Sequence, residues 1–235
     1  MKILNKDKYE FISYSNSNAE FVFSTAKNNL NLSKNSKEGI NNLENLKQWF
    51  ELKEVGYLNQ THSDYIYVYD GKTHEGDAII TKEKNIAVGI FTADCVPILM
   101  YDKTNNVIAA VHSGWKGTEM GIASKTIDKL IENYGTKTED LVVCIGPHIG
   151  GCCYEVSEEL IELFKNNSMY KDIDFHDGRR LNLKKCIMHQ LKYKGVLEDN
   201  IHDVNICTFC NKEYETYSYR RNDKESRLFS FIFLK

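Results

Sequence analysis

Apolar stretches alternate with polar segments along the chain, and the period of the apolar residues changes from one stretch to the next. Over Tyr65–Tyr69 aromatic and aliphatic residues alternate and then meet Asp70-Gly71, which predicts a strand closed by a turn. Val96–Tyr101 and Val107–His112 flank a polar turn and predict a hairpin. Further short apolar stretches predict strands at 77–81, 85–91, 141–145, 217–219 and 228–234.

Other stretches have helical spacing. Apolar residues recur on one face between Ala123 and Tyr134, and Gly135 is placed to end that helix. The same reasoning predicts helices at 157–166 and 181–193, and a short helix at 41–52 after a polar surface loop. Strands mixed with helices predict the α+β fold class, with a single layered domain over residues 1–235 and mixed β-sheets flanked by helices.

The composition is that of a globular protein and excludes several other classes. Hydrophobic residues make up 42% of the chain and charged residues 27%, and a net charge of −3 gives no basic field for nucleic acid. No apolar run reaches the roughly 18 residues that span a bilayer. The N-terminus lacks the apolar segment of a signal peptide. We therefore expect a cytoplasmic protein that binds neither nucleic acid nor membrane; the pattern specifies no oligomeric state.

The predicted hairpin places two metal-binding side chains on one face. If its turn spans Lys103–Asn106, Pro97 lies opposite His112, and Cys95 points to the same side as Pro97. Cys95 and His112 are then diagonal neighbours, with Cα atoms about 7–8 Å apart. A slip of one residue would separate them onto opposite faces. A thiolate with imidazoles suits zinc and also suits copper.

Two histidines compete to be the third ligand. His62 lies in a polar segment before a predicted strand, and His148 lies in a loop between glycines, so the pattern favours neither. A purely structural interpretation also stands, because a cysteine in an apolar run is usually a small buried hydrophobe. A histidine beside glycines often only packs or caps.

Seven cysteines in a chain without a predicted leader indicate reduced thiols rather than a disulfide framework. Cys207 and Cys210 form a lone C-x-x-C motif, whereas a structural zinc site needs a second pair. Cys152 and Cys153 are available, but adjacent cysteines rarely chelate one ion well. We therefore expect buried thiols at all four positions.

Short motifs follow one another from about residue 56 to residue 230. They are Gln60-Thr61-His62, Gly76-Asp77-Ala78-Ile79-Ile80-Thr81, Thr92-Ala93-Asp94-Cys95-Val96-Pro97, Ala109-Ala110-Val111-His112-Ser113-Gly114-Trp115-Lys116-Gly117-Thr118, Ile145-Gly146-Pro147, Cys153-Tyr154-Glu155-Val156, Cys207-Thr208 and Tyr217-Ser218-Tyr219-Arg220-Arg221. Their order and spacing resemble the laccase-domain family, also called the polyphenol oxidase type. Members of that family include purine nucleoside phosphorylases with adenosine deaminase and methylthioadenosine phosphorylase activity.

The resemblance implies a site and a function. The family's metal ligands fall on His62, Cys95 and His112, so the resemblance selects His62 over His148. Zinc is the implied cofactor, with copper possible, and a fourth tetrahedral position stays open for a water whose pKa the metal lowers. The implied partners are phosphate and the purine nucleosides adenosine, inosine, guanosine and methylthioadenosine, with adenosine deamination at the same site.

Other polar residues of the motifs are candidates for binding and proton transfer. Guanidinium groups bind oxyanions bidentately, which makes the Arg220-Arg221 pair a candidate phosphate site, although surface solvation is the plain alternative. Asp77 and Asp94 are candidates to orient ligand histidines or move protons. The expected catalytic residues are Asp77, Asp94 and Lys116, and the expected substrate-binding residues are Gln60, His148, Arg220 and Arg221.

The sequence departs from the family near its N-terminus. Members usually carry an aromatic-Thr-Arg-Gly-Gly-like block where this chain has Phe23–Asn29, and an arginine near the segment Asn42–Lys47. If either block binds phosphate or purine, substrate range and rate change here.

Three other functions are compatible with the same residues. A single copper ion at these ligands would oxidise phenols, although the seven histidines include no H-x-H pair of the multicopper type. Cys95 as nucleophile and His112 as base would make a cysteine hydrolase. A non-catalytic metal or redox binding module is the third.

Overall fold

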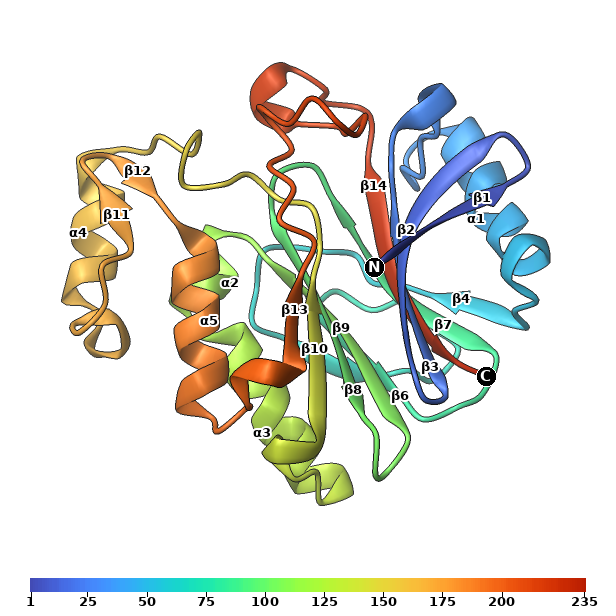
Figure 1. Cartoon of the computed structure of the whole chain (residues 1–235), viewed down its shortest axis with the longest axis horizontal. Helices are drawn as coiled ribbons and strands as arrows, with labels where there is room; N and C mark the ends of the chain where they lie inside the picture. The colour runs from blue at the N-terminus through green and yellow to red at the C-terminus, as the bar shows by residue number, and fades with distance from the viewer.

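Two six-stranded mixed sheets face each other at the centre of the molecule, and the computed structural model describes every residue from 1 to 235 (Figure 1). The first sheet contains, in spatial order, β1 (Lys2–Lys6), β2 (Tyr9–Asn16), β3 (Ala19–Ser24), β14 (Leu228–Leu234), β7 (Ile86–Thr92) and β4 (Glu54–Gly56). The second contains β13 (Ile201–Asp203), β10 (Leu141–Ile145), β8 (Val96–Asp102), β9 (Val107–Ser113), β6 (Ala78–Thr81) and β5 (Ile66–Val68). A separate pair is formed by β11 (His176–Asp177) and β12 (Arg180–Leu181).

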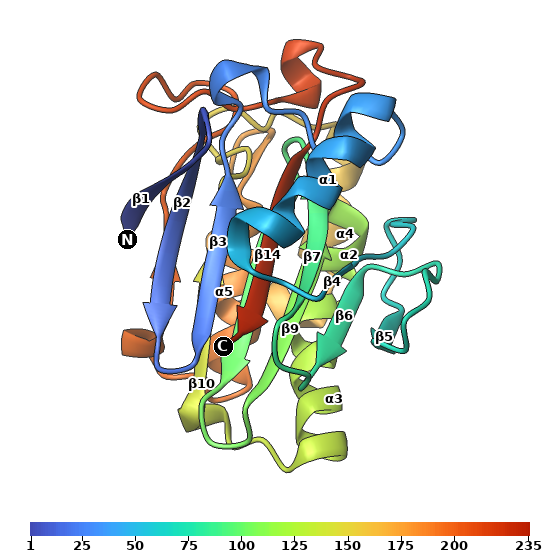
Figure 2. The same ribbon diagram turned by 90° about the vertical axis from the view of Figure 1, so that its right-hand side faces the viewer.

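Helices cover the outer faces of both sheets. On the first sheet lies α1 (Lys37–Phe50), which crosses in front of β14 and β7 in Figure 2. On the second sheet lie α2 (Trp115–Glu119), α3 (Ile122–Tyr134) and α5 (Leu183–Tyr193), with α4 (Glu158–Asn166) beyond them (Figure 1). Short 3₁₀ helices occur at Lys27–Asn29, Thr138–Asp140, Ser168–Tyr170, Glu198–Asn200 and Tyr219–Arg221. No helix combines the length and apolarity needed to cross a bilayer.

The continuous apolar runs of the central strands follow from burial on both faces. In β8, Leu99 and Tyr101 pack between the sheets, whereas Ile98 and Met100 pack against the helices. Because side chains alternate along a strand, both faces need apolar residues when both are covered. The predicted α+β class, with mixed sheets flanked by helices, is confirmed.

Several predicted elements are confirmed with shifted ends. The hairpin has the predicted register, with Pro97 opposite His112 and strand pairs β8 and β9 antiparallel. The helix predicted to stop at Gly135 does so, with that glycine in the left-handed region at φ 67°. The first helix begins at Lys37, earlier than predicted, because the Ser36 side chain accepts a hydrogen bond from Gly39 N and starts it there.

One expected strand is absent, and three strands at the N-terminus were not predicted. Residues 217–219 form no strand, because Ser218 N donates to the Asp223 carboxylate and Ser218 Oγ caps the turn that follows. The polar, alternating N-terminal segment does form strands β1, β2 and β3, which the pattern analysis did not predict. These strands complete the first sheet beside β14.

Candidate metal centre

The three expected metal ligands come together where the hairpin meets the loop before β5. His112 is near the end of β9, Cys95 directly precedes β8, and His62 lies in the loop that leads to β5. The potential ligand atoms of these residues all lie within 4.8 Å of one another. His112 is buried, Cys95 is partly exposed and His62 is exposed, so the cluster is open on the His62 side.

The distances within this cluster fit one shared ion. Cys95 Sγ lies 3.8 Å from His62 Nε2. A tetrahedral zinc ion bonded to both atoms would hold them about 3.6 Å apart. The His62 and His112 rings lie 4.9 Å apart between centroids at 78°, so the two imidazoles approach from different directions. Two imidazoles and a thiolate are a donor set that zinc accepts, and this geometry fits it.

Gly114 allows the ligands to approach one another. A Cβ atom at this position would lie 2.8 Å from His62 Cδ2 and 3.1 Å from Cys95 Sγ. The first distance is below any normal carbon contact, so a side chain here would displace a ligand. The glycine before α2 is therefore required by the cluster itself.

Asp77 positions two of the three candidate ligands. Its buried carboxylate accepts hydrogen bonds from His112 Nδ1 at 2.7 Å and from the backbone nitrogens of Thr61, His62 and Ser63. The Ser63 hydroxyl donates a further bond at 2.6 Å. Because an ionised carboxylate only accepts, His112 carries a proton on Nδ1, so Nε2 is the nitrogen available to a metal, which displaces any proton there on binding.

The charges at the site support one another. Burial alone would raise the pKa of Asp77, but hydrogen bonds and charge from His112, with hydrogen bonds from Ser63, lower it to about 2. Burial likewise disfavours a charged Cys95, yet the positive His112 and hydrogen bonds from both histidines lower the pKa of the thiol. Cys95 is therefore predisposed to be the thiolate that a metal binds.

Asp94 holds the backbone beside Cys95 in a strained conformation. Its φ of 97° lies in the left-handed region, which a non-glycine residue rarely adopts. Its carboxylate accepts from Thr208 Oγ1 at 2.7 Å and from Arg220 N at 2.9 Å. Its carbonyl accepts from Ile149 N at 2.9 Å. Three contacts from distant segments thus fix the residue that precedes the thiol ligand.

A cavity of about 560 Å³ opens from the three ligands. Its lining includes aromatic side chains and three cationic residues; besides the ligands it consists of Ser33, Lys34, Asn35, Gln60, Phe91, Thr92, Ala93, Asp94, Trp115, Tyr154, Tyr219, Arg220 and Arg227. The Arg220 guanidinium stacks over the Tyr154 ring at 5.0 Å and donates to the Glu155 carbonyl. Burial lowers the pKa of Lys34.

The structure divides the expected substrate-binding residues, and the expected catalytic residue Lys116, into those that line the cavity and those that do not. Gln60 and Arg220 line the cavity, although both oxygen and nitrogen of the Gln60 amide already bond to the Phe91 backbone. His148 is buried elsewhere and bonds to the Gly146 carbonyl. Lys116 is exposed and lies over the Trp115 ring, and Arg221 bonds to backbone carbonyls outside the cavity.

Several residues that line the cavity were not predicted from the sequence. Lys34 and Asn35 belong to the segment interpreted as a plain surface loop, and Arg227 lies in no motif. Tyr154 and Tyr219 lie inside the family-like motifs, and this position was the one feature of the sequence that could have indicated a place in the site. Contacts between loops far apart in the sequence bring all five to the cavity.

The expectation of four separate buried thiols was wrong. The sulfur atoms of Cys152, Cys153, Cys207 and Cys210 all lie within 4.8 Å of one another. Cys152 and Cys210 are exposed, and the other two are partly exposed. Two loops meet here, which no local pattern could indicate. The buried free thiols are Cys144 and Cys186.

Comparison with known proteins identifies a matching family, related sequences and similar crystal structures. The model of a family described as multi-copper polyphenol oxidoreductase laccase matches residues 16–235. A purine nucleoside phosphorylase of Clostridium acetobutylicum is 48% identical over 238 residues, which cover 100% of both chains. The crystal structure of the hypothetical protein YfiH of Bacillus licheniformis has a TM-score of 0.82 at 26% identity, covering 92% of this chain and 93% of that one. A Neisseria meningitidis protein has a TM-score of 0.82 at 25% identity, covering 96% and 99%.

Proposed function

The chain belongs to the multi-copper polyphenol oxidoreductase laccase family, and from this premise we propose that it is a zinc-dependent purine nucleoside phosphorylase. The proposal includes adenosine, inosine, guanosine and methylthioadenosine as substrates, and adenosine deamination at the same site. The observation that carries it is the cluster of His62, Cys95 and His112 in the lining of a cavity that also contains aromatic and cationic side chains. A cavity of about 560 Å³ is within the range of small-molecule sites.

In this proposal the three clustered residues hold the ion and Asp77 keeps them in place. When bound, zinc supplies a Lewis acid and a water that ionises near neutral pH. Asp77 holds His112 in the tautomer that ligates and holds the backbone of His62 at the same time. Asp94 fixes the chain that presents Cys95.

The cations of the cavity are the proposed phosphate site. Arg220 offers a planar guanidinium fork, and Lys34 and Arg227 add positive charge to the lining of the same cavity. In phosphorolysis a phosphate oxygen forms a bond to ribose C1′ while the bond from C1′ to the purine nitrogen breaks. The electron pair leaves with the purine, which takes up a proton, so the products are the free base and the ribose phosphate.

The aromatic side chains are the proposed purine site. Phe91, Trp115, Tyr154 and Tyr219 line the same cavity and offer planar faces on which a base can stack. In deamination, hydroxide would add at purine C6 and ammonia would leave, which consumes one water. Both reactions would then take place with the base bound in the same cavity.

One observation keeps a copper alternative in view, since a thiolate with two imidazoles is also a copper donor set. Copper sites with this donor set that transfer electrons usually have a methionine as a weak axial ligand. The cavity lining contains no methionine. A cysteine hydrolase is the other alternative, because the Cys95 sulfur lies within 4.8 Å of a ring nitrogen of His112. Activity that survives complete metal removal would favour the hydrolase.

The experiment is a nucleoside assay with controlled metal content. The metal-stripped protein is reloaded with zinc or copper and incubated with inosine or adenosine, with and without phosphate. We expect phosphate-dependent release of free base with zinc, and its loss in His62→Ala. The control is His74→Ala, which removes a histidine that stacks on Tyr67 outside the cavity. If zinc-loaded protein left both nucleosides unchanged, the proposal would be wrong.

A further inference from the structure

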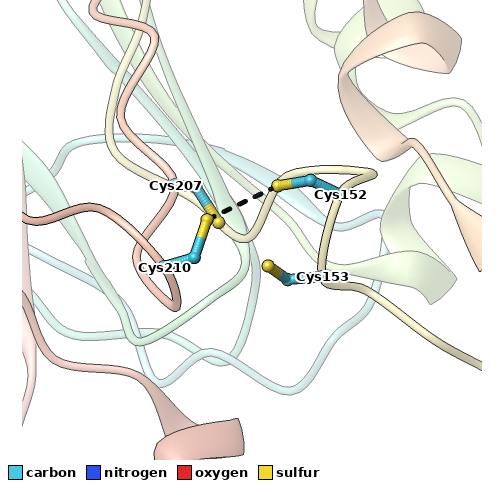
Figure 3. Close-up of side chains that lie close together, drawn as sticks. All are labelled: Cys152, Cys153, Cys207 and Cys210. Atoms are coloured by element: carbon cyan, nitrogen blue, oxygen red, sulfur yellow. Dashed lines mark hydrogen bonds between the residues drawn. The ribbon is translucent and has the colours of Figure 1, made fainter.

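Four cysteines lie close together between two loops and form a cluster separate from His62, Cys95 and His112. Cys152 and Cys153 stand on one loop, Cys207 and Cys210 on another, and all four sulfurs point into the space between the loops (Figure 3). Their sulfur atoms lie within 4.8 Å of one another. Nothing in the proposed reaction uses them.

The backbone of the first loop turns so that adjacent cysteines reach the same point. The nitrogens of Cys153 and Tyr154 both donate to the Gly150 carbonyl, at 2.9 and 3.0 Å, which closes a tight turn. Glu155 N then donates to the Cys153 carbonyl. This turn removes the objection that neighbouring cysteines point apart, because both sulfurs end on its inner side.

The second loop is built to meet the first. Asn211 N donates to the Cys207 carbonyl at 3.0 Å, which closes the turn containing both cysteines of the C-x-x-C motif. Thr208 N donates to the His148 carbonyl and His148 N donates to the Ile206 carbonyl, so the two loops pair alongside each other. The approach is close enough that a Cβ at Gly150 would lie 3.1 Å from Cys152 Sγ and 3.7 Å from Cys207 Sγ.

The sulfur spacing is that of a metal site rather than of a disulfide. Cys152 Sγ and Cys210 Sγ are 3.7 Å apart. In a tetrahedral zinc site with bonds of about 2.3 Å, neighbouring sulfurs are about 3.8 Å apart. A disulfide requires about 2.05 Å. Four sulfurs that converge from two turns are also more than one disulfide would use.

We propose that Cys152, Cys153, Cys207 and Cys210 bind a structural zinc ion, distinct from the metal held by the two histidines and Cys95. Four thiols bind as thiolates and release their protons to solvent, so the site carries a net charge of about −2. Two features already oppose that charge. Gly150 N donates to Cys207 Sγ, and the Arg221 guanidinium donates to the carbonyls of Thr208 and Phe209, between the last two ligands.

The ion fastens a loop that leads into the cavity lining to a second loop that contacts Asp94. The first loop continues into Tyr154, which lines the cavity. In the second, Thr208 follows directly after Cys207 and donates to the Asp94 carboxylate beside Cys95. A closed site with four protein ligands leaves no position for substrate, which is the pattern of structural zinc. Its role is to hold the loops that shape the cavity.

The test is the metal content of full-length variants prepared with zinc under reducing conditions. Wild type is expected to bind about two zinc ions per chain, and the exposed pair Cys152→Ser/Cys210→Ser about one. His112→Ala is also expected to retain about one zinc ion, at the four-cysteine site. The two variants therefore test the two proposed zinc sites independently. The matched control Cys144→Ala removes a buried thiol outside the cluster and keeps both ions.

A second measurement needs no variant of the cluster. Cobalt-substituted wild type should show thiolate-to-metal charge transfer from five thiolates, four in the cluster plus Cys95, whereas Cys95 alone gives the intensity of one. Single-thiolate intensity would overturn the proposal. So would an unchanged zinc content in Cys152→Ser/Cys210→Ser, iron in place of zinc, or an intact mass lighter by two hydrogens with no second zinc.

Discussion

Replacing Asp77 by asparagine tests how the metal centre is held. Five hydrogen bonds converge on this carboxylate: His112 and His62 N donate to Oδ1, while Thr61 N, Ser63 N and Ser63 Oγ donate to Oδ2. Asparagine has one acceptor oxygen and one NH₂ donor. Whichever way the amide is oriented, its NH₂ faces groups that donate.

Both orientations of the amide weaken the site. With the NH₂ at the Oδ2 position, the backbone N–H groups of Thr61 and Ser63 lose their acceptor, at a cost of about 0.5–1.5 kcal/mol each in the free energy of unfolding. With the NH₂ at the Oδ1 position, His112 must accept on Nδ1 and its proton moves to the nitrogen that should bind metal. Loss of such a supporting carboxylate typically lowers metal affinity about 10–100-fold, or about 1–3 kcal/mol.

The assay is equilibrium competition for zinc against a chelator of known affinity at constant pH. The matched control is Asp102→Asn, which changes an equally buried aspartate that caps the hairpin turn through Thr104 N and Asn105 N. We expect Asp77→Asn to lose zinc affinity and Asp102→Asn to lose only stability. If Asp77→Asn destabilised the fold but bound zinc as tightly as wild type, the positioning argument would be refuted.

Further predictions concern the zinc affinity of a Gly114 variant, the KM for phosphate and the pH dependence of stability. Gly114→Ala should weaken zinc binding at least about tenfold in the same competition, because its methyl group would displace a ligand. Arg220→Gln should raise KM for phosphate about 10–100-fold in the nucleoside assay, whereas Arg180→Gln, whose exposed side chain pairs with Asp177 outside the cavity, should leave KM unchanged. The metal-free protein should lose about 2 kcal/mol of stability as pH falls from 4 towards 2, because the pKa of Asp77 lies below its ordinary value of 3.8 and the stabilisation is lost on protonation. Urea unfolding should show this pH dependence reduced in Asp77→Asn; an equal slope in both proteins would contradict it.

The hairpin that carries two ligands could be predicted from the sequence because its determinants are local. A polar turn sets the register, and the two-residue period of a strand then decides which side chains share a face. Pro97 does lie opposite His112, as that reasoning requires. The helices ending at Gly135 and beginning after Ser157 were predictable for the same reason, since their capping residues adjoin them.

The remaining parts of the site depend on contacts between distant segments. His62 is held beside the hairpin by Asp77, 15 residues away, which binds its backbone. Lys34 enters the cavity from a loop whose local pattern is merely polar. The four-cysteine cluster joins loops 58 residues apart between Cys152 and Cys210. In each case the local pattern carries no information about the partner segment.

The central claim is that one metal ion is held by His62, Cys95 and His112. Its most direct test is an anomalous difference map, recorded at the zinc absorption edge from crystals of the zinc-loaded protein. We predict a peak about 2.0–2.3 Å from His62 Nε2, Cys95 Sγ and His112 Nε2. A map without zinc within bonding distance of these three atoms would contradict the account.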